Sequence, residues 1–308
     1  MSFRSGFVSI IGRPNAGKST LLNALVGEKV AIVTHKPQTT RHRLQGFVNV
    51  KGGQGRVPGQ IIFVDTPGVH KPDSPLGRRM MREVNAALEE RDLVLLIVDV
   101  TQRFGSGDEF VLQLLKKVTS PVILLLNKID TIDKPMLLEI IDRYSKLRDF
   151  AEIIPISATK RRGLEELIDE VIKRLPEGPR YFEKDQITDQ PERILVAEMI
   201  RERVLIETGQ EVPYATAVKI ERFEEGAKLT RIAAAIYCER EGQKAILIGK
   251  GGAMLKRIGM SARKQIERLL GTKVFLELFV KVRENWRSSE AALDELDWRN
   301  QVESLGQE

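Results

Sequence analysis

The chain has 308 residues, of which 42% are hydrophobic and 30% are charged, a balance typical of a folded globular protein with about two domains. Its longest apolar runs, Leu93 to Val98 and Val122 to Leu126, are too short to span a bilayer, and the start of the chain lacks the apolar core of a signal peptide. We therefore expect a cytoplasmic protein, and the single Cys238 agrees with a reducing compartment.

The formal net charge of +6 is unevenly distributed. Residues 1–180 hold 28 Lys and Arg against 21 Asp and Glu, whereas residues 181–308 hold 21 against 22. Bulk charge therefore does not mark the second half as a nucleic-acid-binding region, and only a local basic cluster can do so.

Apolar strands alternate with helical patterns through the first 175 residues. The predicted strands are Phe7 to Ile11, Ile61 to Val64, Leu93 to Val98, Val122 to Leu126 and Ile153 to Ile156. Continuous apolar strands separated by helices indicate an α/β domain with a mostly parallel sheet covered on both faces, placed at 1–176. Proline-rich polar residues then predict a linker at 177–192.

The order of elements changes after this linker. The pattern predicts a helix near 192–208, strands near 214–223 and 229–239, helices near 243–248 and 252–270, and a strand near 273–283. We place this α+β domain at 193–285. A C-terminal tail at 286–308 follows, with a short helix predicted from Trp286 to Gln301.

Residues 12–19 match the phosphate-binding pattern GxxxxGKS, between a strand and a helix as that pattern requires. Glycines let backbone N–H groups face phosphate, Lys18 can reach the β and γ phosphates, and the Ser19 hydroxyl can ligate Mg²⁺. The residues predicted to contact the phosphates here are Gly12, Arg13, Pro14, Asn15, Ala16, Gly17, Lys18, Ser19 and Thr20.

The tetrapeptide Asn127-Lys128-Ile129-Asp130 favours guanine over adenine, because it follows an apolar strand. A carboxylate at Asp130 can accept from the ring N–H and the amino group of guanine, and adenine has no such pair of donors. Asn127 can brace the loop, while the stem of Lys128 can cover the ring. After the next strand come Ser157 and Ala158, where a backbone N–H can meet the guanine oxygen.

A third motif, Asp65-Thr66-Pro67-Gly68, follows the strand Ile61 to Val64. Asp65 is placed to hold Mg²⁺, and the Gly68 N–H to meet the γ-phosphate. The predicted nucleotide-binding residues also include Thr66, Pro67 and Val69 here and Ile129 in the base-selecting tetrapeptide. A threonine in the preceding Pro37-Gln-Thr-Thr-Arg-His42 can complete the magnesium shell, and Thr40 is favoured over Thr39 without a decision between them. We expect Lys18, Thr40 and Gly68 to act directly in hydrolysis.

The residue after Gly68 is Val69, where many GTPases carry a glutamine that orients the attacking water. Valine has no polar group. We therefore predict slow unaided hydrolysis, with the water held by other means.

The second half contains the loop Gly249-Lys250-Gly251-Gly252 between two predicted helices. Such a GxxG loop lets a nucleic-acid backbone approach closely and presents a helix start to phosphate. From Lys244 to Lys273 there are eight Lys and Arg and one acidic residue, and the element order is that of a KH domain. On the helix near 252–270, an apolar residue recurs every four positions and predicts a buried stripe of Met254, Ile258, Ala262, Ile266 and Leu270. The predicted RNA-binding residues are the four loop residues with Lys256, Arg257 and Lys264, the last three of which fall off that stripe.

Together these motifs resemble the bacterial Era family of GTPases over nearly the whole chain. The resemblance implies a Ras-like P-loop GTPase domain followed by a type II KH domain, with GTP or GDP and Mg²⁺ as ligands. It also implies binding to the 3′ end of small-subunit ribosomal RNA and assistance in small-subunit assembly. Loose peripheral association with the inner membrane and a monomeric state are expected as well, and Asn15 matches an asparagine that accompanies potassium-dependent hydrolysis in relatives.

Two other hypotheses remain at this point. The chain can be a signalling GTPase whose C-terminal domain docks on a protein or membrane surface, or a metabolic P-loop kinase. The guanine motif and the lack of an evident acceptor site argue against the kinase.

Overall fold

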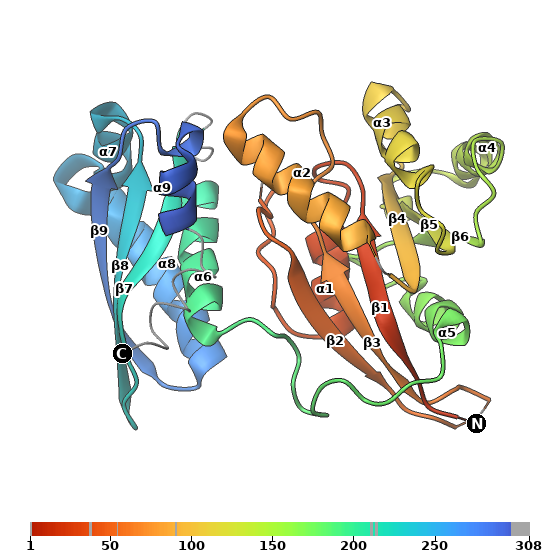
Figure 1. Ribbon diagram of the computed structural model, residues 1–308. Coiled ribbons are helices and arrows are strands. Elements are labelled where there is room, and N and C mark those ends of the chain that lie inside the picture. The colour runs from red at the N-terminus through yellow and green to blue at the C-terminus, as the bar shows by residue number, and fades with distance from the viewer. Residues whose placement is uncertain are drawn as a thin grey trace. The chain divides into compact units, whose positions relative to one another are not determined.

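The computed structural model describes residues 2–36, 39–53, 55–89, 91–209, 212 and 215–296. The described chain divides into two compact units: the first holds residues up to Pro72 and Gly77–Asp189, and the second holds Asp73–Leu76 and the residues from Gln190 onward (Figure 1). Each unit is built on a sheet of its own, with six strands in the first unit and three in the second.

The sheet of the first unit has the strand order β2-β3-β1-β4-β5-β6. Its strands are β1 (Arg4–Ile11), β2 (Leu44–Val50), β3 (Gly59–Asp65), β4 (Leu93–Asp99), β5 (Val122–Asn127) and β6 (Glu152–Ile156). β2 runs antiparallel to β3, and all other neighbours are parallel. The predicted mostly parallel sheet is confirmed, whereas the antiparallel edge strand β2 was not expected from the sequence.

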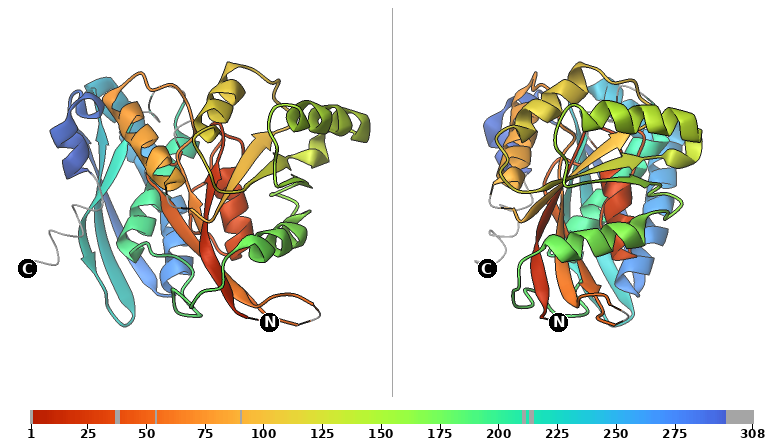
Figure 2. Two further views of the ribbon diagram at one scale, coloured as in Figure 1. Left: turned by 45° about the vertical axis from the view of Figure 1, so that its right-hand side comes forward. Right: turned by 90° about the vertical axis from the view of Figure 1, so that its right-hand side faces the viewer.

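Helices cover both faces of this sheet, as the two views of Figure 2 show. They are α1 (Lys18–Val26), α2 (Pro75–Leu88), α3 (Ser106–Leu115), α4 (Lys134–Ser145) and α5 (Leu164–Arg174), with a 3₁₀ turn η1 (Ile129–Thr131) after β5. One hydrophobic cluster joins the sheet to α1 and α5, and a second joins its other face to α2, α3 and α4.

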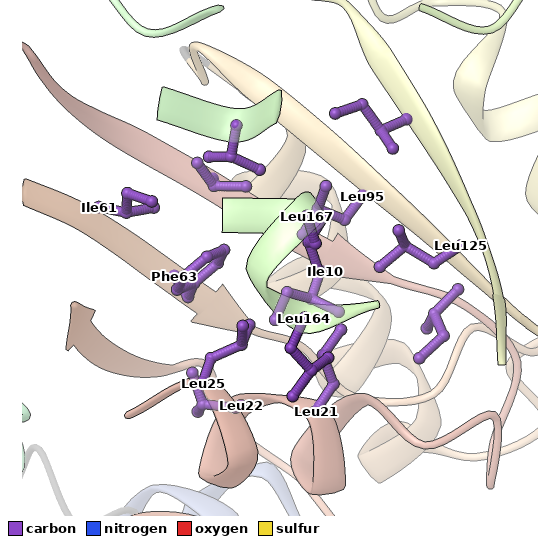
Figure 3. Packing of buried hydrophobic residues seen from close by; sticks show 14 of the residues in the cluster. Ile10, Leu21, Leu22, Leu25, Ile61, Phe63, Leu95, Leu125, Leu164 and Leu167 are labelled. Atoms are coloured by element: carbon purple, nitrogen blue, oxygen red, sulfur yellow. The ribbon is translucent and has the colours of Figure 1, made fainter. Parts of the chain in front are cut away.

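Alternation along the central strands explains why two cores form. Leu93, Leu95 and Ile97 of β4 belong to the first cluster, while Val94 and Leu96 belong to the second. Successive side chains of a strand point to opposite faces of the sheet. A strand that is apolar throughout therefore contributes side chains to both cores. Figure 3 shows the first cluster, in which labelled side chains from α1, α5 and four strands converge: Ile10, Leu21, Leu22, Leu25, Ile61, Phe63, Leu95, Leu125, Leu164 and Leu167.

The parallel strands all end at one edge of the sheet, where the predicted nucleotide motifs lie. Gly12 follows β1, Asp65 ends β3, Asn127 ends β5 and Ser157 follows β6. Ligands of open α/β sheets bind at this edge.

The segment predicted as a linker is attached to the first unit over much of its length. The backbone N–H of Phe47 on β2 donates to Ile187 at 2.9 Å, and Phe182 stacks on Phe47 with ring centroids 3.9 Å apart. The buried Gln60 side chain accepts from the backbone N–H groups of Tyr181 and Phe182 at 2.9 and 3.0 Å. The Phe47–Ile187 bond pairs part of the free edge of β2, which would otherwise expose unpaired backbone groups, and the Gln60 bonds tie the segment to β3.

The second unit has the order helix-strand-strand-helix-helix-strand that the sequence predicts. Its elements are α6 (Glu192–Glu207), β7 (Ala217–Glu224), β8 (Leu229–Cys238), α7 (Glu241–Ile248), the 3₁₀ turn η3 (Lys250–Gly252), α8 (Ala253–Leu270) and β9 (Lys273–Val282). β7 is antiparallel to β8, and β8 is parallel to β9 through the α7–α8 crossover. The start of the predicted strand, Tyr214, lies outside the described residues.

α6 and α8 cover one face of this sheet. Ile258, Ala262 and Ile266 on the predicted apolar stripe of α8 are fully buried, in one cluster with α6 and the strands.

The tail holds η4 (Trp286–Ser288) and α9 (Glu290–Glu295). Trp286 is buried and its indole N–H donates to the Ala215 carbonyl at 2.9 Å, whereas the end of the predicted tail helix lies outside the described residues.

Among the described residues, no helix combines the length and the apolar character that crossing a membrane requires.

Candidate nucleotide site and nucleic-acid groove

The phosphate loop wraps from the end of β1 to the start of α1. Gly17 caps α1 with a φ of 104°, and a Cβ placed on it would lie 2.3 Å from the Asn127 side-chain nitrogen. Asn15 also has a positive φ, of 63°, and its side-chain amide donates to the His35 carbonyl at 2.8 Å. The loop conformation therefore depends on glycine at position 17 for backbone geometry and for space.

Lys18 is folded back against its own loop. Its ammonium donates to the carbonyls of Gly12 and Arg13 at 3.1 and 2.9 Å. Burial lowers the pKa of Lys18 to about 8, although the nearby Asp65 carboxylate acts in the opposite direction. A buried ammonium held by neutral carbonyls is well placed to gain from an incoming triphosphate, which would compensate its charge.

Three oxygen-bearing side chains meet beside Lys18. The Ser19 hydroxyl donates to Asp65 at 2.6 Å and lies 2.8 Å from the Thr40 hydroxyl. The other Asp65 oxygen, Oδ1, is buried and has no hydrogen-bond partner among the described residues. Burial raises the pKa of Asp65 to about 6, against the opposing effects of Lys18 and Ser19.

This donor set fits magnesium, which prefers oxygen ligands and keeps several positions for phosphate and water. A hard cation would also satisfy the orphaned Asp65 Oδ1. Thr39 is directed elsewhere, since its hydroxyl donates to the Lys36 carbonyl at 2.6 Å. The structure thus brings Thr40, and not Thr39, to Ser19 and Asp65. Gln38 of the same motif lies outside the described residues.

The Asp65–Gly68 motif leads from β3 along the phosphate loop. The Thr66 hydroxyl donates to the Ile10 carbonyl at 2.8 Å, and the Val69 N–H donates to the Gly12 carbonyl at 3.0 Å. Gly68 lies so close to Pro14 that an added Cβ would be 2.7 Å from its Cα. The Val69 side chain is 1% exposed and belongs to the hydrophobic core. It therefore faces the interior and takes no part in a polar site.

Asn127 ties the base-selecting segments together. Its amide N–H₂ donates to the Ala16 carbonyl at 2.9 Å, and its oxygen accepts from the Ala158 N–H at 3.0 Å. The predicted bracing role thus has a structural basis, but the Ala158 N–H that was expected to meet the guanine oxygen is engaged by Asn127. Asp130 is exposed, and its pKa is lowered chiefly by a hydrogen bond from the Ser157 hydroxyl.

One cavity of about 510 Å³ joins these motifs. Its lining comes from the phosphate loop, the segment before β2, the Asp65–Gly68 motif and the two base-selecting loops, including Asn15, Lys18, Ser19, Thr40, Gly68, Lys128 and Thr159. Asp99, which also lines it, was not singled out from the sequence. The feature of the sequence that could have identified Asp99 is its place at the carboxyl end of the strand Leu93–Asp99.

The GxxG loop of the second unit is open to the surroundings. Gly251 and Gly252 have φ values of 60° and 80°, and a Cβ placed on either would meet no atom within 4 Å. A groove of about 350 Å³ starts at this loop and runs between α8 and β9. Its lining residues are Gly252, Leu255, Lys256, Gly259, Met260, Arg263, Phe275, Leu276 and Leu278.

The predicted basic residues divide into two groups around this groove. Lys256 lines it, together with Arg263, which was not included in the prediction. Arg257 instead pairs with Glu207 at the end of α6, at 2.6 Å, and Lys264 is exposed but is not part of the lining. The sequence placed all of them off the buried stripe of α8 but could not say which of them faces the groove.

Comparison with known proteins agrees with both halves of this description. Residues 7–128 match a family described as 50S ribosome-binding GTPase, and residues 211–287 match the KH domain family. Proteins called GTPase Era from Ruminiclostridium cellulolyticum and Geobacter metallireducens are 49% and 51% identical, over 97% and 96% of this chain and 99% and 98% of theirs.

Solved structures extend this similarity to the fold. An Aquifex aeolicus Era variant bound to GDP and AlF₄⁻ has a TM-score of 0.91 at 40% identity, covering 96% of this chain and 99% of its own. An Era complex with MgGDPNP and nucleotides 1506–1542 of 16S ribosomal RNA has the same TM-score at 41% identity, with the same coverage. The Ras-like GTPase fold with a C-terminal KH domain is confirmed, and the chain belongs to the Era family of GTPases.

Proposed function

We propose that this chain is a GTP-hydrolysing switch that binds small-subunit ribosomal RNA near its 3′ end and assists assembly of the small ribosomal subunit. The observation that carries the proposal is that one chain joins a magnesium-compatible nucleotide cavity to an open GxxG groove. The similar Era structure with MgGDPNP and 16S ribosomal RNA supports it by holding both kinds of ligand in one complex.

In this proposal the cavity binds GTP or GDP with Mg²⁺. Ser19, Thr40 and Asp65 hold the metal, whose charge stabilises the negative charge that develops on the phosphates during hydrolysis. Lys18 leaves its two carbonyl partners to contact the β and γ phosphates, and the Gly68 N–H meets the γ-phosphate. Asp130 accepts from the edge of guanine, while Asn127 and Ser157 keep the base-selecting loops in place.

Slow unaided hydrolysis follows from the buried Val69. The structure offers no polar group at that position for the attacking water, because the side chain packs in the core. Potassium is a further proposed cofactor, since Asn15 matches the asparagine that accompanies potassium-dependent hydrolysis in relatives and its side-chain amide is held in the loop by the His35 carbonyl at 2.8 Å. Measuring the hydrolysis rate in potassium and in sodium, for the natural chain and for Asn15→Ala, tests this part.

The RNA site is proposed to consist of the loop Gly249, Lys250, Gly251 and Gly252 together with Lys256. Backbone N–H groups at the start of α8 and the Lys250 and Lys256 cations contact phosphates, while bases enter the groove beside β9. Arg257 and Lys264 contribute to the positive field around the groove and make fewer direct contacts.

The proposed domain limits are 1–176 for the GTPase domain, 177–192 for the connecting segment, 193–285 for the KH domain and 286–308 for the tail. We further propose a monomeric protein of the cytoplasm with loose peripheral association with the inner membrane.

Binding of labelled RNA tests the proposed partner. A single strand with the 3′-end sequence of 16S ribosomal RNA is compared with a scrambled strand of the same length and composition, at two salt concentrations. We expect tighter binding of the 3′-end strand and a loss of affinity for both as salt rises. Equal affinity for the two strands would contradict rRNA recognition and favour a signalling GTPase whose C-terminal domain docks on a protein or membrane.

A further inference from the structure

Asp99 is a buried carboxylate at the carboxyl end of β4 that no motif includes. Its side chain is 8% exposed, and the residue lines the nucleotide cavity. One oxygen, Oδ1, accepts from the Thr101 backbone N–H at 3.0 Å and from the Thr101 hydroxyl at 2.7 Å. Two hydrogen bonds to one oxygen fix the orientation of the carboxylate.

The second oxygen of Asp99 holds the side chain of Lys128. The Lys128 ammonium lies 2.6 Å from Asp99 Oδ2, and β4 and β5 place Asp99 beside Asn127 in register. Lys128 has a left-handed backbone, with a φ of 71°, next to the firmly bonded Asn127. Both ends of the Lys128 side chain are therefore fixed, and the methylene stem between them runs along the wall of the cavity.

We propose that Asp99 is a positioning residue for guanine nucleotides, acting by holding the Lys128 stem where the face of the base will lie. The inference rests on the proposed guanine site. A stem held in advance loses little side-chain entropy when the base packs on it, whereas an unrestrained lysine loses rotamer freedom on binding.

The burial of the pair distinguishes it from an ordinary surface ion pair. The Lys128 side chain is 37% exposed, but Asp99 is nearly inaccessible, and a buried carboxylate deprived of its cation is unfavourable. Breaking the pair is therefore unfavourable, and the Lys128 stem stays held at the cavity wall.

The contact made by the stem is to the face of the base, and not to its edge. Substitution of Asp99 should therefore weaken the binding of every purine nucleotide that fits the site by the same factor. Asp130, which contacts the edge, should change the preference between guanine and hypoxanthine, since hypoxanthine lacks the 2-amino donor.

Affinities for GDP and IDP measured on the full chain test the inference in four variants: Asp99→Asn, Lys128→Met, both together, and Asp92→Asn. Asp99→Asn keeps an acceptor for Thr101 and removes the charge, while Lys128→Met keeps a long apolar stem. Asp92 directly precedes the other end of β4, where it accepts a hydrogen bond from the Phe7 N–H at 2.7 Å, and provides a matched control.

We expect Asp99→Asn to weaken GDP and IDP binding equally, by about tenfold, because the stem is released in both cases. In the Lys128→Met background the same change should have no further effect, which a double-mutant cycle measures. The hydrolysis rate at saturating GTP should stay unchanged while KM rises. Asp92→Asn should bind GDP as the natural chain does, and Asp99→Glu should recover part of the lost affinity.

The inference would be overturned if Asp99→Asn reduced GDP affinity by the same factor in the natural chain and in the Lys128→Met variant. Asp99 would then act on the fold and not through Lys128. The inference would also be overturned if Asp99→Asn bound GDP as tightly as the natural chain does. Unchanged GDP and IDP binding in Lys128→Met would overturn it as well, because the stem would then not need to be held. If the natural chain bound IDP as tightly as GDP, the 2-amino group would not be recognised and the proposed guanine site would be wrong instead. The two failures are therefore distinguishable.

Discussion

The molecule contains two glycine loops that each precede a helix, and their glycines are needed for different reasons. In the phosphate loop, Gly17 touches Asn127 so closely that any side chain would collide with it. In the GxxG loop, Gly251 and Gly252 have the same left-handed backbone but face open space. The first loop is held by the interior of its own unit, and the second leaves room for a ligand.

This difference follows from where each loop lies. The phosphate loop is at the carboxyl edge of a parallel sheet, where loops from several strands crowd together and Asn127 bonds Ala16 at 2.9 Å. The GxxG loop connects two helices at the surface. Similar sequence patterns thus serve a preformed pocket in one unit and an accessible backbone in the other.

The largest effect should come from Gly17→Ala. The added methyl group would lie 2.3 Å from the Asn127 nitrogen, so the loop must move away from its binding conformation. We expect GDP affinity to fall by at least about a hundredfold, measured by titration with a fluorescent nucleotide. RNA binding by the second unit should persist.

The matched control for this change is Gly27→Ala at the other end of α1. Gly27 has a φ of 88° but nothing within 4 Å of its Cβ position, so it carries the backbone strain without the collision. It should cost about 1 kcal/mol of folding stability and leave GDP affinity unaltered. Equal losses of GDP affinity in the two variants would contradict the crowding argument.

Gly251→Asp should reduce RNA affinity by roughly tenfold or more, because it puts a carboxylate where phosphate is expected to approach. Filter binding or fluorescence anisotropy with 3′-end RNA measures this, and GDP affinity should not change. Gly271→Asp is the control, since Gly271 caps the far end of α8 with a φ of 67° and open space around it. If Gly251→Asp bound RNA as tightly as the natural chain does, the proposed RNA site would be wrong.

A smaller effect should separate Lys256 from Arg257. Lys256 lines the groove, whereas Arg257 is paired with Glu207 at 2.6 Å. Lys256→Ala should weaken RNA binding about threefold to tenfold and lower the salt dependence by about one counterion, and Arg257→Ala should do clearly less. Salt titrations of both variants measure the slopes, and a larger loss for Arg257→Ala would show that its ion pair opens on binding.

The smallest effect on catalysis should come from Val69→Ala. Its side chain is buried in the core of the first unit, so the substitution should lower the unfolding free energy by about 1–3 kcal/mol through lost packing. The hydrolysis rate at saturating GTP should stay within about twofold of the natural rate. A collapse of that rate with normal GTP binding would mean that Val69 acts on the attacking water after all.

Local patterns were sufficient to predict much of the fold and of the nucleotide site. Unbroken apolar runs such as Leu93 to Val98 predicted buried parallel strands, because both faces of such strands need apolar cover. The motifs at Gly12, Asp65 and Asn127 predicted a common edge, because parallel strands end together. The apolar spacing of Ile258, Ala262 and Ile266 likewise predicted which face of α8 is buried.

Other features depend on neighbours far away in the sequence, and no local pattern contains them. β2 was missed because its residues alternate only partly, and its place is fixed by pairing with β3. The segment predicted as a linker is bound to β2 through Phe47 and to β3 through Gln60. Thr39 and Thr40 are chemically equal in the sequence, and only the hydrogen bonds of each hydroxyl distinguish them.

The sequence by itself therefore determined the class of fold, the family and the kind of ligand, because these depend on residue types at fixed short spacings. The tertiary structure alone decided which side chains meet: Thr40 and Asp65 with Ser19, Arg257 with Glu207, and Asp99 with Lys128. The physical reason is that hydrogen bonds and ion pairs act over a few ångströms, and only the folded chain brings residues from distant segments to such distances.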